Sequence, residues 1–242
     1  MTQRAVTGEA RVKAAVVVLA AGSGSRVGAE VNKVLLPLAG MPVVARSVQT
    51  ARRVSGVERV VLVARDGEQD AVRAAVEPHL DDHGPEVAMV TGGATRHLSE
   101  WAALAFLAPA IEAGELTVVA MHDAARPLAT TALYDAVLAA AEAVGGAIPV
   151  AALHDLVAVE GSAVTDGLVG VQTPQAFRAG DLLAAHRAAA ADGFEATDTA
   201  AILAAYTPLA VAAVESDDSN LKLTVADDFV VAEALVAGVT AP

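Results

Sequence analysis

The chain has 242 residues, of which 55% are hydrophobic, with no cysteine and a formal net charge of −13. The length suits one large α/β domain, and the lack of cysteine excludes disulfides, a thiol nucleophile and a thiolate metal site. The acidic balance argues against a surface for nucleic acid or anionic membrane. No apolar run is long enough to span a bilayer or to serve as a signal peptide, so we expect a cytoplasmic protein.

Short valine-rich runs alternate with helical patterns over the first 150 residues. Strands are expected at 14–20, 58–65, 87–90, 117–121 and 147–152. Helices are expected at 42–54, 69–76, 95–107 and 131–144. This alternation predicts an α/β fold of three layers, Rossmann-like, with a mixed, mostly parallel sheet covered by helices on both faces. Residues 1–12 are polar and non-periodic, and we expect them to be a flexible terminus before a single domain at 13–242.

The pattern changes after residue 152. The segment 153–171 is too long for a tight connection, and we interpret it as a projecting β-arm that pairs with a second subunit in a homodimer. The elements expected after it are helices at 181–191 and 199–206, a strand at 211–214 and a final helix. Thr224 is predicted to open that last helix, with Asp227 completing a capping box in which Asp replaces Glu.

The strand at 14–20 runs into a glycine-rich turn, Ala21-Gly22-Ser23-Gly24-Ser25-Arg26. Small residues let the backbone turn sharply and bring several N–H groups close to one anion. Arg26 adds a planar fork for phosphate oxygens and Lys33 a compact cation. The stretch predicts a triphosphate-binding loop, although a turn of this kind can also be only a tight turn. It is neither a Walker loop nor a dinucleotide fingerprint, because no G-K-[ST] follows and Val27 replaces the third glycine.

Two further turns follow predicted strands, Thr91-Gly92-Gly93 and the run from His122 to Pro127, HDAARP. In a sheet of this class the ligand site lies at the carboxyl ends of the strands. We therefore expect both turns to lie beside the glycine-rich loop. Because the chain is acidic overall, an anionic substrate has to be met by a local cluster of cations.

Four segments, taken together in order and spacing, resemble one family. They are LAAGSGSR at 19–26 with Lys33 after it, GGATRHLS at 92–99, HDAARP at 122–127 and QTPQAF at 172–177. They are similar to the 2-C-methyl-D-erythritol 4-phosphate cytidylyltransferases, with the ribitol-5-phosphate cytidylyltransferases as close relatives. The resemblance covers residues 14–238. It implies a nucleotidyltransferase domain that moves CMP from CTP to a phosphorylated polyol and releases pyrophosphate.

The resemblance also implies roles for individual residues. The implied catalytic residues are Arg26, Lys33 and Lys222. The implied nucleotide-binding residues are Ala20, Ala21, Gly22, Ser23, Gly24, Gly92, Gly93, Arg96, Ser99 and Ala124. The implied acceptor-binding residues are Asp123, Thr197 and Lys222. No protein side chain is assigned to a metal, and Mg²⁺ is expected to bridge the phosphates of CTP.

Several of these residues also have a purely structural interpretation. Arg96 can favour its own helix terminus, Ser99 can be a surface serine of the helix, and Asp123 can form a strand-end ion pair with Arg126. Lys222 can be a solvated lysine, and Thr197 can cap the helix that follows. His122 is expected only to shape its turn.

Departures from the family pattern cluster on the acceptor side. The family usually has an arginine seven residues before Gln172, where this chain has Thr165. In the arm, the family's Asp-Thr-x-Lys becomes Asp155-Leu156-Val157-Ala158, which loses a hydroxyl and a cation. Two further differences lie near the nucleotide: Ala94 replaces an aspartate and Asn32 replaces a proline.

Three hypotheses remain open from the sequence. The chain is a 2-C-methyl-D-erythritol 4-phosphate cytidylyltransferase, a cytidylyltransferase for another polyol phosphate or a phosphonate, or a non-catalytic dimeric paralogue that binds CTP. Retention of Arg26 and Lys33 argues against the third.

Overall fold

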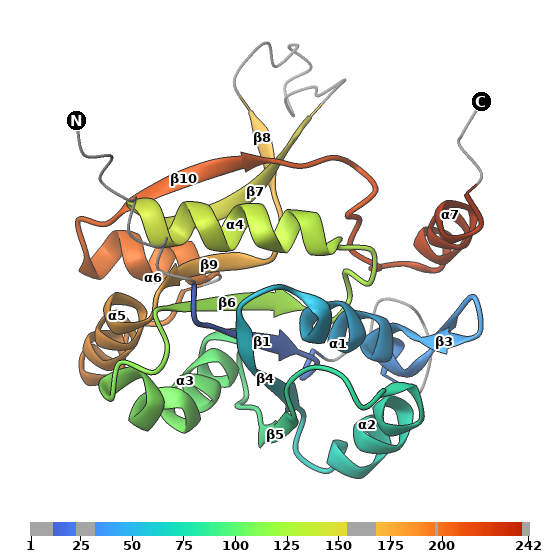
Figure 1. Ribbon diagram of the computed structural model, residues 1–242, viewed down its shortest axis with the longest axis horizontal. Helices are drawn as coiled ribbons and strands as arrows, with labels where there is room; N and C mark the ends of the chain where they lie inside the picture. The colour runs from blue at the N-terminus through green and yellow to red at the C-terminus, as the bar shows by residue number, and fades with distance from the viewer. Residues whose placement is uncertain (1–11, 23–31, 154–167, 197, 239–242) are drawn as a thin grey trace, which may run out of the picture.

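The computed structural model describes residues 12–22, 32–153, 168–196 and 198–238. In this part of the chain an eight-stranded sheet forms the centre of the molecule, in the order β10-β7-β9-β6-β1-β4-β5, with β8 paired to β7 (Figure 1). The strands are β1 (Ala14–Leu19), β4 (Val57–Ala64), β5 (Val87–Thr91), β6 (Val118–Asp123), β7 (Gly145–Ala152), β8 (Val169–Val171), β9 (Gln175–Arg178) and β10 (Ala210–Glu215).

The sheet is mixed and mostly parallel, as predicted. β1 lies parallel between β4 and β6, β5 is parallel to β4, and β10 is parallel to β7. β9 is antiparallel to both of its neighbours, β6 and β7, and β8 is antiparallel to β7. A small hairpin of β2 (Pro37–Leu38) and β3 (Met41–Pro42) stands apart from the main sheet.

Helices cover both faces of the sheet (Figure 1). They are α1 (Val43–Arg53), α2 (Gln69–Val76), α3 (Arg96–Glu112), α4 (Thr131–Val144), α5 (Ala179–Asp192), α6 (Thr199–Tyr206) and α7 (Ala226–Val236), with short 3-10 helices η2 (Lys33–Leu35) and η3 (Glu77–His79). None of the described helices is long and apolar enough to cross a membrane.

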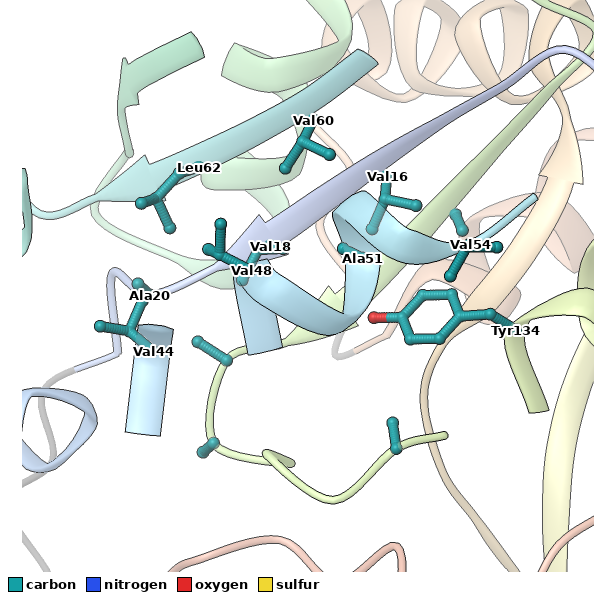
Figure 2. Packing of buried hydrophobic residues seen from close by; sticks show 14 of the residues in the cluster. Val16, Val18, Ala20, Val44, Val48, Ala51, Val54, Val60, Leu62 and Tyr134 are labelled. Atoms are coloured by element: carbon teal, nitrogen blue, oxygen red, sulfur yellow. The ribbon is translucent and has the colours of Figure 1, made fainter. Parts of the chain in front are cut away.

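Strand β1 is buried on both faces because its side chains alternate between two hydrophobic clusters. Val16 and Val18 pack with residues of α1 and α4 on one face, as Figure 2 shows for Val48 and Tyr134. Val17 packs on the other face with residues of α3 and α5. A fully buried central strand needs apolar residues at every position, and this explains the continuous valine run.

The register of the sheet brings three strand ends to one place. Leu19 at the end of β1 pairs with Val63 of β4 and with Asp123 of β6. The chain segments that follow these parallel strands therefore leave the sheet side by side, at the edge where α/β proteins bind ligands.

Two expectations need correction. No strand was expected between the arm and the helix at 181–191, but Gln175–Arg178 forms β9, between β6 and β7. The cap of α7 lies one residue later than predicted: the Asp228 carboxylate accepts the N–H of Val225 at 2.8 Å and that of Thr224, and the helix begins at Ala226. This is half of a capping box: Asp228 is three residues after Val225, but valine has no side-chain oxygen, and the N–H of Asp228 donates to the carbonyl of Val225 at 3.2 Å instead.

Candidate active site

A pocket of about 560 Å³ opens at the carboxyl ends of β1, β4, β5 and β6. The described residues that line it are Leu19, Ala21, Gly22, Lys33, Val34, Arg65, Asp66, Gly92, Gly93, Ala94, Thr95, Arg96, Ser99, Asp123, Ala125 and Lys222. The turns after the predicted strands do meet at this edge, as the sequence indicated. Lys222, about a hundred residues from Asp123 in the sequence, joins them.

The lining is rich in positive charge although the chain is acidic. Lys33, Arg65, Arg96 and Lys222 are cationic, and among the described lining residues only Asp66 and Asp123 oppose them. Such a concentration of cations in a concave site attracts and holds polyanions such as a nucleoside triphosphate. The expected local cluster for an anionic substrate is therefore present.

Asp123 holds two of these cations in place. It is the last residue of β6, and its carboxylate forms ion pairs with Arg96 through Oδ1 and with Lys222 through Oδ2, the latter at 2.7 Å. Burial alone would raise the pKa of the Asp123 carboxyl, but the charges of Arg96 and Lys222 outweigh it and hold that pKa well below its usual range. The carboxylate thus stays ionised and orients both cations toward the pocket.

Lys222 reaches the site because its segment is bound to the turn after β6. The N–H of Leu223 donates to the carbonyl of Ala125 at 2.8 Å, and Arg126 Nη1 donates to the carbonyl of Asn220 at 2.7 Å. Leu223 is fully buried and anchors the segment. Arg126 is therefore used to hold the Lys222 segment, and it is not among the described residues that line the pocket.

The turn after β5 brings backbone close to the pocket because both of its glycines are tightly enclosed. A Cβ on Gly92 would lie 2.8 Å from the Cβ of Ala21, and a Cβ on Gly93 would lie 2.3 Å from that of Leu98. The N–H of Gly93 donates to Ser99 Oγ at 3.2 Å, and this hydroxyl donates to the carbonyl of Thr95 at 2.9 Å. The Ser99 side chain, near the start of α3, is thus buried against the turn, and Ser99 is not a surface serine.

Lys33 is held at the end of β1 by the residue before it. Asn32 Nδ2 donates to the carbonyl of Ala20 at 3.1 Å and to Glu68 Oε2 at 2.8 Å. The Asn32 Oδ1 accepts the N–H of Val34 at 3.3 Å and so caps η2. Asn32, a departure from the family pattern, therefore ties the turn that carries Lys33 to the strand end.

His122 has the structural role that was expected. Its ring is buried, with Nε2 3.1 Å from the carbonyl of Arg126 and Nδ1 3.2 Å from Thr173 Oγ1. The carbonyl of Arg126 can only accept, so the histidine proton lies on Nε2; the Thr173 hydroxyl accepts the N–H of Asp123 at 3.0 Å and donates to Nδ1. Burial lowers the pKa of His122 to about 4, so the ring is neutral and fixes the turn.

The remaining candidates divide into two groups. Ala20 and Ala124 are buried, and neither is among the described pocket-lining residues. Ser23, Gly24, Arg26 and Thr197 lie outside the described residues, as do Thr165, Leu156 and Ala158 of the arm.

Several residues of the site were not expected from the sequence. Arg65 and Asp66 line the pocket after β4, and Glu100 pairs with Arg96 at 2.9 Å. The spacing of four residues between Arg96 and Glu100 on a helix is the one signal that predicts such an ion pair. The burial of Glu100 depends on α5 and α6, which approach α3 only in the folded chain.

Comparison with known proteins identifies relatives over most of the chain. The family model described as "IspD: 2-C-methyl-D-erythritol 4-phosphate cytidylyltransferase" matches residues 14–238. A 2-C-methyl-D-erythritol 4-phosphate cytidylyltransferase from Synechococcus sp. (strain JA-3-3Ab) is 36% identical over 228 residues, covering 90% of this chain and 94% of the relative. One from Cereibacter sphaeroides (strain KD131) is 39% identical over 232 residues, covering 92% and 96%.

Comparison with solved structures finds a protein of the same name with a similar fold. The crystal structure of 2-C-methyl-D-erythritol 4-phosphate cytidylyltransferase from Thermus thermophilus superimposes with a TM-score of 0.69 at 30% identity, over 92% of this chain and 98% of that one.

Proposed function

The chain belongs to the 2-C-methyl-D-erythritol 4-phosphate cytidylyltransferase family, and we propose that it transfers CMP from CTP to 2-C-methyl-D-erythritol 4-phosphate with release of pyrophosphate. This reaction supplies isoprenoid precursors in the non-mevalonate pathway. The observation that carries the proposal is that Lys33 lines the same pocket at the strand ends as Asp123 and the two cations paired with it, Arg96 and Lys222.

The reaction needs positioning and charge neutralisation more than covalent chemistry. An oxygen of the acceptor phosphate attacks the α-phosphorus of CTP, and the bond from that phosphorus to the pyrophosphate oxygen breaks. Lys33, expected to act with Arg26, offsets the charge that builds on the α-phosphoryl group and the leaving group. Lys222, oriented by Asp123, holds the acceptor phosphate for in-line attack.

The turn after β5 has the groups needed to recognise cytosine. The enclosed Gly92 and Gly93 bring backbone C=O groups to the pocket, and the Ser99 hydroxyl lies beside them, whereas the N–H of Gly92 already donates to the carbonyl of Ala64 at 2.7 Å and that of Gly93 to Ser99 Oγ at 3.2 Å. Arg96 adds a cation at the start of α3. In this proposal the nucleotide site is completed by Ala20 to Gly24 and by Ala124, through their backbone or side chains. The acceptor site is completed in the same way by Asp123 and Thr197.

The pocket fits Mg²⁺ as an ion carried by the substrate. Among the described residues, no group of three or more His, Asp or Glu side chains could hold a metal. Mg²⁺ needs few protein ligands when phosphates supply oxygens, and the described pocket lining holds two carboxylates, Asp66 and Asp123. When bound, the ion neutralises phosphate charge, while the side chains hold and orient the substrates.

A second candidate differs only in the acceptor. Thr165, Leu156 and Ala158 replace residues that the family pattern uses on the acceptor side, and each lost charge-assisted contact to phosphate is worth about 1.5–3 kcal/mol. This observation favours, as the alternative, a cytidylyltransferase for another polyol phosphate or a phosphonate.

We further propose a homodimer formed through the arm at 153–171, in the cytoplasm. Apolar side chains at the base of the arm support this, since Leu153, Leu168, Val169 and Val171 are all exposed in the single chain. Exposed apolar groups gathered at one site mark a surface that associates with another.

The test is pyrophosphate release from CTP and Mg²⁺ with a panel of acceptors: 2-C-methyl-D-erythritol 4-phosphate, ribitol 5-phosphate, glycerol 3-phosphate and a simple phosphonate. The Lys33→Ala variant serves as the blank. Turnover with 2-C-methyl-D-erythritol 4-phosphate as the preferred acceptor supports the proposal. Turnover with another acceptor alone supports the second candidate, and no turnover with any of them, while CTP still binds, argues for the non-catalytic alternative.

A further inference from the structure

Behind the pocket wall lies a buried polar cluster that the proposed reaction does not use directly. Glu100, His186 and Thr199 are buried to at least 99%, on α3, α5 and α6 respectively. The Glu100 carboxylate is their common partner: Thr199 Oγ1 donates to Oε1 at 2.9 Å, and His186 Nε2 lies 3.4 Å from Oε2. The ring of His97 stacks on His186 with centroids 5.2 Å apart.

A buried carboxylate is costly unless charge and hydrogen bonds compensate it. Arg96 brings a full positive charge to Glu100, with its Nε 2.9 Å from Oε1. Arg96 is the first residue of α3 and lines the pocket, whereas Glu100 is one turn further along, inside the protein. The cluster therefore touches the site through one side chain.

The guanidinium of Arg96 has two anionic partners in two directions. Its Nε faces Glu100 inside the protein, and its Nη1 faces Asp123 at the strand end. A planar guanidinium held at two of its donors cannot rotate without breaking one of the pairs. Asp123 in turn binds Lys222, so the orientation of Arg96 bears on both cations of the pocket.

We infer that Glu100 is a positioning residue for the proposed reaction, which fixes the Arg96 guanidinium in the orientation that receives the nucleotide. Thr199 and His186, on two other helices, contact the Glu100 carboxylate and keep it inside the protein. The inference rests on the proposed function for the role of Arg96, and its test separates the two.

The primary variant is Glu100→Gln, which keeps the shape of the side chain and removes its charge. Trp101 is the single tryptophan of the chain and directly follows Glu100 on α3, so its fluorescence can report CTP binding without turnover. We expect CTP affinity to fall roughly tenfold, the value of one charge-assisted hydrogen bond. The KM for CTP should rise by a similar factor, with a much smaller change in kcat.

The relative changes in KM and kcat of the variant distinguish a positioning role of Glu100 from an effect on the stability of the protein. A merely structural role lowers the fraction of folded enzyme, which reduces apparent kcat and leaves KM unchanged. The matched control is Glu112→Gln on the same helix, where Glu112 pairs with Arg187 at 2.7 Å and both side chains are exposed. This control should keep wild-type CTP affinity and KM.

A double-mutant cycle shows whether Glu100 acts through Arg96. In an Arg96→Ala background, Glu100→Gln should cause no further loss of CTP affinity. Should Glu100→Gln fail to fold, Thr199→Val removes one donor to Glu100 without changing charge, and it should weaken CTP binding about threefold. Unchanged CTP affinity and KM in the folded variants, or full additivity in the cycle, would overturn the inference.

Failure of the proposed function gives a different result. If the wild-type protein binds CTP but transfers CMP to no acceptor, the fluorescence cycle still tests Glu100. If the protein transfers CMP and the Glu100→Gln variant matches it in CTP affinity and KM, only the inference fails.

Discussion

Lys222 Nζ lies 2.7 Å from Asp123 Oδ2 and thereby joins the end of β6 to a segment about a hundred residues away. Asp123 is buried, whereas the side chain of Lys222 is 39% exposed and faces the pocket. The pair places a cation where the acceptor phosphate is proposed to bind.

Asp123→Asn tests this relationship. Removing the carboxylate leaves Arg96 and Lys222 without their shared anion, so we expect the KM for the acceptor to rise about tenfold to a hundredfold. We also expect a loss of about 1–3 kcal/mol in the free energy of unfolding, measured in urea. Asp66→Asn is the control, since Asp66 lines the same pocket but is exposed. Equal effects of the two substitutions on the acceptor KM would contradict the assignment.

Asp123 also sets part of the pH dependence of stability. Its pKa is lower in the folded protein than in the unfolded chain, so the unfolded state takes up a proton more readily. The stabilisation by Asp123 is therefore complete above the unfolded pKa, about 3.9, and is lost as the pH falls toward the folded value. In urea titrations from pH 7 to pH 3, the stability difference between wild type and Asp123→Asn should shrink below about pH 4. A difference that grows as the pH falls would show that the sign is wrong.

Gly93→Ala tests the close backbone approach after β5. A Cβ at this position would lie 2.3 Å from the Cβ of Leu98, so the turn must shift and the nucleotide site with it. We expect a loss of about 1–3 kcal/mol in stability and a clear loss of CTP affinity. The control is Gly180→Ala, because nothing lies within 4 Å of a Cβ there. Wild-type CTP affinity in Gly93→Ala would exclude this turn from the nucleotide site.

Asn32 is expected to set the position of Lys33. Asn32→Ala removes the bonds to Ala20 and Glu68 and the cap of η2, so kcat should fall and stability should drop by about 1 kcal/mol. Asn32→Pro is a sharper comparison, because the φ of −56° at this position suits proline. We expect it to retain more activity than Asn32→Ala, measured as kcat under saturating substrates. Activity in Asn32→Pro no higher than in Asn32→Ala would show that a fixed backbone angle does not compensate for the lost side-chain hydrogen bonds.

Deleting residues 155–166 tests the proposed dimer. The deletion removes most of the arm and leaves β7 and β8, which pair directly through Val150 and Val171. We expect sedimentation to show a monomer with the melting temperature of the main body preserved within a few degrees. A shortened chain that still sediments as a dimer would place the interface elsewhere.

The sequence predicted the parallel part of the fold well because local signals define it. Helix α4 has the predicted bounds, Thr131–Val144, since Thr130 caps its start and Gly145, with a φ of 120°, ends it. The buried β1 and the turn at Gly92 and Gly93 were equally readable, because a fully apolar strand is typical of a sheet centre and paired glycines are typical of a tight turn.

Non-local pairing explains what the sequence did not predict. β9 has only four residues, and its place is set by β6 and β7, which lie well before it in the sequence, on the other side of the arm. The sequence does not indicate that Glu100 is buried, because the groups that compensate for burying its carboxylate come from α5 and α6. The hydrogen bond from Arg126 to the carbonyl of Asn220 likewise could not be predicted, because the two residues lie far apart in the sequence.

The most direct test of the account is phosphorus NMR of the wild-type protein with CTP, Mg²⁺ and 2-C-methyl-D-erythritol 4-phosphate, followed until the substrates are consumed. We expect a new diphosphate diester and pyrophosphate in equal amounts, with both lost in Lys33→Ala and retained in Lys13→Ala, a control at the opposite end of β1. Unchanged CTP, or its hydrolysis without the diester, would contradict the proposed transfer.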